Sequence, residues 1–331
     1  MRKTILRLSL VLGLSLFALV VIRAGPGRIV ADLARLSAAQ FAILLALRAV
    51  FWVLRTFNWK QVYDCYEGKR PFLRLFEARL ADNAVGFLTP SAMLGGLPVR
   101  AMMLEGVDRR RVFASVVLDK TIEGSTMAAY TVLAMLAALF FLPMTDAARL
   151  AFIAFIVLAT ALCVVLLAGQ RRGGLFVGVL DRLGRLGIRL KWAEKRRESL
   201  LAIDAAVAEF YRDRRSLIPS VVGLYSLSYL VWAVEIDITL RFLGAPGLSL
   251  IKSLLVISLG NVALLLPTVP ASLGVYELTN VGVFAILGWS AGMAVALSVI
   301  RRLLALAWAA AGLLALFWRQ RKPRIRRVEE A

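Results

Sequence analysis

The chain has 331 residues, of which 60% are hydrophobic, and its mean hydropathy is +0.77. It carries 41 Lys and Arg residues against 21 Asp and Glu residues, a formal net charge of +20. Soluble domains are about 45–50% apolar, so this excess is too large for one globular core. Apolar spans separated by charged loops explain both values, and we predict an all-α polytopic integral membrane protein.

The residue content also excludes several kinds of site. The chain has no histidine, which excludes Ser-His-Asp triads, Cys-His dyads and histidine metal sites. Cys65 and Cys163 are far apart, so neither a disulfide framework nor a thiolate zinc site is expected. Gly68-Lys69 is followed by Arg70, which leaves the chain without a P-loop. We therefore expect no catalytic residues, cofactor or metal. We also expect no nucleic-acid partner, because the basic residues flank apolar spans.

Apolar runs of membrane-spanning length recur along the chain. The first follows basic residues and could be a signal peptide, but its length and the poor cleavage site after it favour an uncleaved helix. About six full spans are predicted. In chain order they are Ile5–Ile22, Ala38–Phe57, Phe113–Leu142, Ala147–Ala168, Leu217–Leu243 and Ala291–Trp318.

Two further segments, residues 72–97 and 250–287, are apolar but contain helix-breaking Pro and Gly. In a bilayer, the backbone groups freed by such breaks are tolerated only inside protein or against a wet cavity. The two segments also resemble each other, since their Asn residues are 178 apart, their Pro residues are 177 apart, and a one-residue gap places Arg100 opposite Glu277. The first contains Asn83, Pro90, Gly95 and Gly96 and is followed by Arg100, and the second contains Asn261, Pro267, Gly274 and Glu277.

The distribution of Lys and Arg predicts the orientation of the spans. Positive charge is concentrated before residue 5, in residues 169–215 and in the tail, so these parts and both termini are expected to be cytoplasmic. The parity of the spans then requires the first broken segment to be a re-entrant hairpin from the cytoplasmic side and the second to start and end outside. This predicts an inverted-topology repeat around a midplane site, unless the Asn-Pro-Gly clusters recur by chance.

We therefore expect a single membrane domain over residues 1–331 with two halves. The first half covers residues 1–168 with the broken segment 72–97, and the second covers residues 216–318 with the broken segment 250–287. Between them, residues 169–215 form a basic loop with 12 Lys or Arg and 6 Asp or Glu residues, and residues 319–331 form a basic tail. Leu201, Ala205, Ala208 and Tyr211 have the spacing of an amphipathic surface helix in the loop.

Charged residues within the spans are candidate binding residues, because burying them in a membrane is costly. Arg48 and Arg55 share one helix face, with Trp52 and Trp59 four residues after each, which suggests a phosphate-binding face with stacked indoles. Alternatively, Arg55 reaches the cytoplasmic interface.

A second set of charges follows the first broken segment. Asp119, Lys120 and Glu123 either bind substrate or form structural ion pairs with Arg100 or Arg79. In the last span, Arg301 or Arg302 should face the interior and meet a carboxylate, with Glu277 and Glu235 as candidates.

At these motifs the chain resembles the flippase-like transmembrane domain of lysylphosphatidylglycerol synthetases and its stand-alone relatives. Two departures are Pro270-Ala271-Ser272, where the family commonly has Pro-Gly-Gly, and Leu97, where an acidic residue often follows Gly-Gly. The chain ends at Ala331, without the soluble aminoacyl-transfer domain of the two-part synthetases. The residues that carry the resemblance are Asn83, Pro90, Gly95, Gly96, Arg100, Asp119, Lys120, Glu123, Asn261, Pro267, Gly274, Val275, Tyr276 and Glu277.

The resemblance implies translocation of a lipid, or support of a lipid or glycolipid pathway, without lipid synthesis. The expected partners are membrane lipids, which are either anionic or zwitterionic phospholipids or else polyprenyl lipids or glycolipids. A second copy of the chain or a pathway enzyme is a further possible partner. The alternatives are a membrane-embedded lipid-phosphate transferase and a non-catalytic accessory subunit. We expect a bacterial inner-membrane location. The expected substrate-binding residues are Arg48, Arg55, Asn83, Pro90, Gly95, Gly96, Arg100, Asp119, Lys120, Glu123, Asn261, Pro267, Gly274, Tyr276, Glu277 and Arg301.

Overall fold

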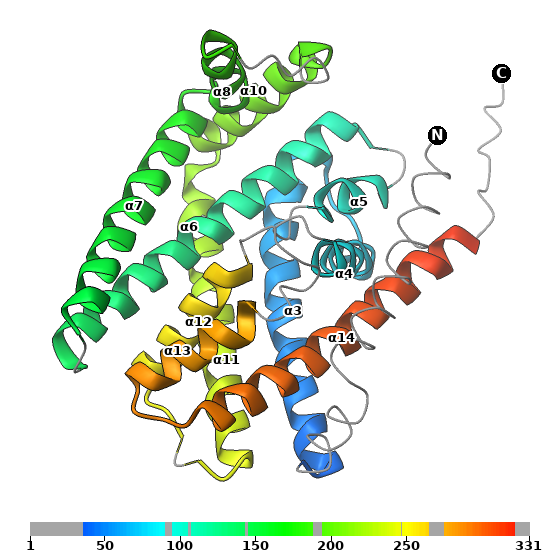
Figure 1. Ribbon diagram of the computed structural model, residues 1–331. Coiled ribbons are helices and arrows are strands. Elements are labelled where there is room, and N and C mark those ends of the chain that lie inside the picture. The colour runs from blue at the N-terminus through cyan, green and yellow to red at the C-terminus, as the bar shows by residue number, and fades with distance from the viewer. Residues whose placement is uncertain are drawn as a thin grey trace, which may run out of the picture.

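The computed structural model describes residues 36–89, 95–104, 107–142, 145–187, 194–245, 247–264 and 275–321. Within these ranges every regular element is a helix and no strand occurs, which confirms the all-α class (Figure 1). The first predicted span, Ile5–Ile22, lies outside the described residues, as does most of the basic tail.

Five of the described helices are long and apolar enough to cross a membrane, so the protein is a multi-pass membrane protein. They coincide with the five later predicted spans, except that the first of them ends at Glu67 rather than at Phe57. The five are α3 (Ala38–Glu67), α6 (Arg109–Phe141), α7 (Asp146–Arg171), α11 (Ile218–Phe242) and α14 (Ala291–Arg321).

Local sequence signals account for the boundaries of these helices. Ser37 and Gln40 form a reciprocal capping box at the start of α3, and Gly68, with a φ of 75°, follows its last residue. Asp108 accepts a hydrogen bond from the backbone at the start of α6, and Thr145 does the same for α7.

The two irregular segments form pairs of short helices, as their Pro and Gly residues predict. With 17, 6, 15 and 12 residues, these helices are shorter than the roughly 20 residues that a span requires. Three of the predicted breaking residues, Pro90, Pro267 and Gly274, lie outside the described residues. The pairs are α4 (Phe72–Leu88) with α5 (Leu97–Met102), and α12 (Leu250–Leu264) with α13 (Val275–Ile286).

The described helices form two units with the same order: a long helix, a broken pair and a second long helix. The first unit is α3, α4–α5 and α6, and the second is α11, α12–α13 and α14. In the packing, α3 contacts α11, whereas α4 contacts α14 and α12 contacts α6 (Figure 1). A two-fold relation would exchange the last two contacts and preserve the first, so this arrangement is the one expected of two related halves.

The contact between α4 and α14 depends on close approach of the two backbones. A Cβ atom at Gly312 in α14 would lie 2.1 Å from the backbone oxygen of Leu80 in α4. Any larger residue at this position would push the helices apart. The glycine therefore fixes the first broken pair against the last helix of the other unit.

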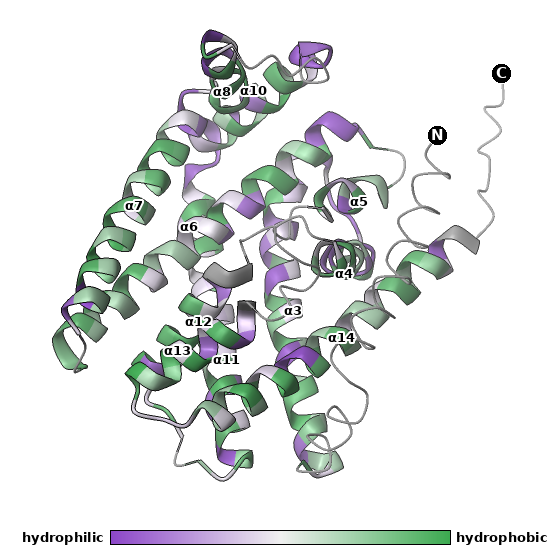
Figure 2. Cartoon of the chain, viewed as in Figure 1, coloured by the Kyte–Doolittle hydropathy of each residue, from purple (hydrophilic) through white to green (hydrophobic). Residues whose placement is uncertain are grey.

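Outside the two units, α7, α8 (Leu175–Arg185) and α10 (Arg197–Asp213) lie at the edge of the molecule. Most apolar side chains of α7 are exposed, as suits a helix that faces lipid, and Figure 2 shows hydrophilic residues gathered around α8 and α10. The predicted amphipathic helix is α10, and its predicted face is correct only in part, since Ala208 and Tyr211 are half-buried. Leu201 and Ala205 are exposed, and the buried residues are Ile203, Asp204, Val207 and Phe210.

Candidate functional site

Charged side chains converge from several helices on the interior of the protein. Arg48 and Arg55 lie 10 and 17 residues after the first residue of α3, a helix of 30 residues. Arg301 and Arg302 lie 10 and 11 residues after the first residue of α14, which has 31. These four arginines therefore lie in the central third of helices that are long and apolar enough to span the membrane.

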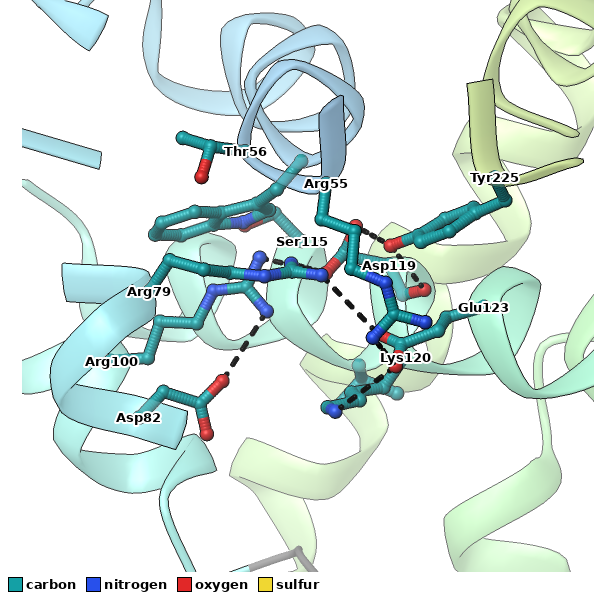
Figure 3. Close-up of polar contacts among 12 residues, drawn as sticks. Arg55, Thr56, Arg79, Asp82, Arg100, Ser115, Asp119, Lys120, Glu123 and Tyr225 are labelled. Carbon is teal, nitrogen blue, oxygen red and sulfur yellow. Dashed lines mark hydrogen bonds and ion pairs between the residues drawn. The ribbon is translucent and has the colours of Figure 1, made fainter. Parts of the chain in front are cut away.

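Asp119 of α6 is the centre of the first cluster of charges (Figure 3). Arg79 donates to its carboxylate at 2.6 Å, Arg100 donates at 2.7 Å, and the hydroxyl of Tyr225 donates to the same group. Asp119 and Arg100 are fully buried. Asp119 thus joins α4, α5, α6 and α11, which matches the structural ion-pair alternative.

One turn further along α6, Glu123 is shared by three cations. Arg55 of α3 lies 2.7 Å from its carboxylate, Arg79 lies at 3.3 Å, and Lys120 lies at 3.5 Å. Figure 3 shows Arg55 of α3 and Arg79 of α4 pointing toward Glu123 of α6. Arg55 is buried in this cluster, so the alternative in which it reaches the membrane interface is not observed.

Two further ion pairs complete the network. Arg48 of α3 pairs with Glu235 of α11, and thereby joins the two units. Arg302 of α14 pairs with Glu277 of α13, one of the two carboxylates expected to meet an arginine of the last span.

The pair of Arg302 with Glu277 has a counterpart in the first unit, in which the positive and negative residues are exchanged. Arg100, on the second helix of one broken pair, meets Asp119 of the following long helix, whereas Glu277, on the second helix of the other pair, meets Arg302 of its long helix. Each unit thus attaches its broken pair to the following helix by a charge pair, which is fully buried in the first unit and partly buried in the second.

Aromatic rings also contact the arginines, but they are not the predicted ones. The guanidinium of Arg55 lies 4.4 Å from the ring centroid of Phe51, and that of Arg48 lies 5.2 Å from both Phe51 and Trp232. Trp59, the predicted partner of Arg55, receives Arg100 at 3.6 Å instead. The predicted tryptophans were wrong, because the rings that Arg48 and Arg55 contact are Phe51, on the same helix between them, and Trp232 and Tyr225 of α11.

These side chains surround one cavity of about 290 Å³ between the two units. Its lining comes from α3, α4 and α6 of the first unit and from α11 to α14 of the second. Of the predicted binding residues, the lining includes Arg48, Arg55, Asn83, Lys120, Glu123, Asn261, Tyr276 and Arg301.

Of the other predicted binding residues that the structure describes, none lines this cavity. Arg100 and Asp119 lie buried beside it, and Glu277 pairs with the lining residue Arg302. Gly96 has a packing role, because a Cβ there would lie 1.9 Å from the backbone oxygen of Asp82. Gly95 precedes it in the same turn.

Comparison with known proteins agrees with this architecture. The family model described as the lysylphosphatidylglycerol synthase transmembrane region matches residues 6–312. The chain belongs to this family. A relative from Methanothermobacter thermautotrophicus, described as a UPF0104 membrane protein, is 27% identical over 317 residues, which is 89% of each chain. No solved structure matches.

Several lining residues of this family member were absent from the predicted binding set. Arg79 and Arg302 were considered only as ion-pair partners, although both are charges within apolar segments. Trp232 and Trp308 carry no signal in the sequence, since tryptophan is common in membrane helices. The added lining residues are Phe51, Trp52, Arg79, Asp82, Phe87, Gly124, Met127, Trp232, Ser298, Arg302, Ala305 and Trp308.

The cavity is rich in hydrogen-bond donors. Among the described residues, buried donor atoms without a protein partner include the indole nitrogens of Trp52, Trp232 and Trp308 and two guanidinium nitrogens of Arg301. Each unsatisfied buried donor costs about 1–3 kcal/mol. A ligand with several acceptor oxygens would satisfy them, so the cavity is chemically suited to a phosphate-like group.

Proposed function

We propose that this protein is a flippase-like lipid transporter, in which the polar head group of a phospholipid or polyprenyl lipid enters the cavity while the acyl chains stay in the bilayer. The observation that carries the proposal is the cavity itself, lined by cations and tryptophans from both units. Charged residues inside membrane spans usually mark a substrate or ion pathway.

The depth of the cavity supports this proposal. Its arginines lie near the middle of α3 and α14, and Lys120 and Glu123 lie near the middle of α6. A polar site at mid-depth between two related halves that contain broken helices is the usual arrangement of transporters with inverted repeats. Lipid movement needs only weak, reversible contacts at such a site.

We further propose the orientation that the charges predict. In Figure 1, α8 and α10 lie at one end of the molecule, and the turn between α6 and α7 and the loop between α11 and α12 lie at the other. The basic residues of the 169–215 segment favour the first end as cytoplasmic. The loop before α12 and the turn after α13 lie at one end, which supports a re-entrant hairpin.

Reconstitution into liposomes tests the transport function. Gly124 lines the cavity, and a Cβ added there meets no atom within 4 Å, so Gly124→Phe should fill the cavity without disturbing the helices. Gly223 of α11 is equally free of neighbours but is exposed on the outer surface, and Gly223→Phe is the matched control.

We expect the unaltered protein and Gly223→Phe to speed the movement of tail-labelled fluorescent phospholipids between leaflets, and Gly124→Phe to slow it by about tenfold or more. Equal rates in all three proteins, or no movement of any lipid, would show that the cavity is not a transport route. Conversion of a supplied polyprenyl phosphate into a new product would favour the transferase alternative.

A further inference from the structure

Arg301 differs from the other cations of the cavity. It is 8% exposed, and it is the one lining cation for which the described residues provide no carboxylate within ion-pair distance. The ten residues between α12 and α13 contain no Asp or Glu in the sequence.

Aromatic faces hold the Arg301 guanidinium on two sides. Its central carbon lies 4.8 Å from the ring centroid of Trp232 and 5.4 Å from that of Tyr276. Two of its nitrogens, Nε and Nη1, have no hydrogen-bond partner. A buried arginine is normally paired or fully hydrogen-bonded, so this side chain is prepared for an acceptor that the protein does not supply.

Each of the carboxylates, by contrast, already has a cationic partner. Oε2 of Glu235 has no hydrogen-bond partner, but this oxygen is buried and Glu235 does not line the cavity. Glu123 is shared by Arg55, Arg79 and Lys120. The other carboxylates in question either line the cavity or pair with a cation that lines it, and each of them contacts at least one arginine. These other pairs are Asp119 with Arg79 and Arg100, Glu235 with Arg48, Glu277 with Arg302, and Asp82 with Arg100.

Among these carboxylates, Asp82 has the longest ion-pair distance, since its carboxylate oxygen lies 3.6 Å from the Arg100 guanidinium nitrogen. It is nonetheless buried, and a Cβ at Gly96 would lie 2.3 Å from its Oδ1, so the start of α5 covers that oxygen. An ammonium group would have little access to it.

The charges at the cavity do not balance. Among the described residues, seven cations and five carboxylates line the cavity or form an ion pair with a lining residue. Positive charge inside a membrane protein is unfavourable unless it is neutralised. An anion bound at Arg301 would supply this neutralisation.

We propose that the head group bound at Arg301 is an anionic phosphate ester without an amino group, and that amine-bearing head groups bind poorly. The inference rests on the proposed function, because it assumes that a lipid head group enters this cavity. Phosphate oxygens would accept from Arg301 and from the indole N–H groups. The same chemistry is offered by phosphatidylglycerol and by a polyprenyl phosphate.

Lipid binding is the decisive measurement, and it can be separated from transport. Purified full-length protein in detergent is titrated with phosphatidylglycerol, a short polyprenyl phosphate, phosphatidylethanolamine and lysyl-phosphatidylglycerol, with bound lipid counted by native mass spectrometry. The variants are Arg301→Gln, Arg301→Lys, Asp82→Asn and the surface control Arg212→Gln, whose side chain is 77% exposed.

We expect the unaltered protein and Arg212→Gln to bind at least one of the two anionic lipids about tenfold more tightly than either amine-bearing lipid. Arg301→Gln should remove this preference and Arg301→Lys should keep part of it, whereas Asp82→Asn, which removes a cavity carboxylate, should keep or strengthen it. The comparison of the two anionic lipids then shows whether the phosphate comes from a phospholipid or a polyprenyl lipid.

Tighter binding of an amine-bearing lipid, with loss of that preference in Asp82→Asn, would overturn the inference. So would an anionic preference that survives in Arg301→Gln, or the absence of binding. The two proposals fail separately: binding that depends on Arg301 without leaflet exchange would contradict transport alone, and leaflet exchange without an anionic preference would contradict this inference alone.

Discussion

At the scale of single residues, the buried charges of this protein serve two purposes. Asp119 and Glu123 each hold several cations from different helices, so they act as structural junctions. Arg301 holds no carboxylate among the described residues and lies against two aromatic rings. The two kinds of charge should respond differently to neutralisation.

Arg79→Gln should destabilise the protein strongly, by about 3–5 kcal/mol, because breaking a buried ion pair leaves a charge without its partner. Arg301→Gln should leave stability unchanged or raise it, because it removes a buried cation that lacks a carboxylate. Thermal unfolding of the two variants in the same detergent measures this difference. A larger loss of stability in Arg301→Gln than in Arg79→Gln would contradict the assignment of roles.

Gly96→Ala should also lower stability, because its Cβ would lie 1.9 Å from the backbone oxygen of Asp82 and would force α5 away from α4. The matched change Gly124→Ala meets no neighbouring atom, and it should stabilise α6 by roughly 0.5–1 kcal/mol through helix propensity. The two melting temperatures should move in opposite directions. A shift of the same sign in both variants would exclude close packing as the reason for glycine at position 96.

At the scale of helices, each broken pair is fixed to the long helix after it by a charge pair, and the order of charges is reversed between the two units. Such pairs hold the interrupted helices beside the cavity. They also connect the cavity to α5 and α13, the shorter helix of each broken pair.

The pair in the second unit can be tested by reversal. Arg302→Glu places a carboxylate beside Glu277 and should reduce both lipid movement and stability, whereas the double change Glu277→Arg with Arg302→Glu should recover stability. The double-mutant cycle, measured by thermal unfolding, isolates the interaction of the two residues. Additive effects of the two changes would show that the pair contributes nothing to the attachment of α13.

Much of the helical arrangement could be predicted, because spans and breaks are local features of the sequence. Hydrophobic runs indicated the five described spans, and Pro and Gly indicated both interruptions. The buried face of α10 could not be predicted reliably. Its alanines allow two apolar faces, and contact with α6 and α8 selects the face that carries Val207 and Phe210.

The site was predictable only in part, for a related reason. Arg48, Arg55 and Arg301 stand out as charges within apolar spans, and all three line the cavity. Trp232 and Trp308 do not stand out, because their importance arises from packing between helices of different units. Which carboxylate meets which arginine also depends on that packing, as the pairing of Arg48 with Glu235 shows.

At the scale of the whole molecule, the two units face each other across a cavity lined by charged and aromatic side chains, inside a multi-pass membrane protein. The packing of α4 on α14 and of α12 on α6 joins each broken pair to the other unit. A change at one broken pair would therefore be transmitted to the other side of the cavity, which suits a transporter whose halves move against each other.

The proposed orientation gives a further test at this scale. In a variant without Cys65 and Cys163, a single cysteine at Ser199, in the first turn of α10, should react only with reagents on the cytoplasmic side. A cysteine at Ser249, before α12, should react only from outside, because the two positions lie at opposite ends of the molecule. Labelling of intact cells with a membrane-impermeant maleimide measures both, and labelling of Ser199→Cys from outside would reverse the orientation.

The central claim is that a lipid head group enters the cavity, and photocrosslinking tests it most directly. A phospholipid with a photoreactive group on its head group is reconstituted with the protein, and the adducts are mapped by peptide mass spectrometry. We predict adducts on cavity-lining parts of both α6 and α14, their loss in Gly124→Phe and their retention in Gly223→Phe. Adducts confined to lipid-facing surfaces such as α7, or unchanged by Gly124→Phe, would contradict the account.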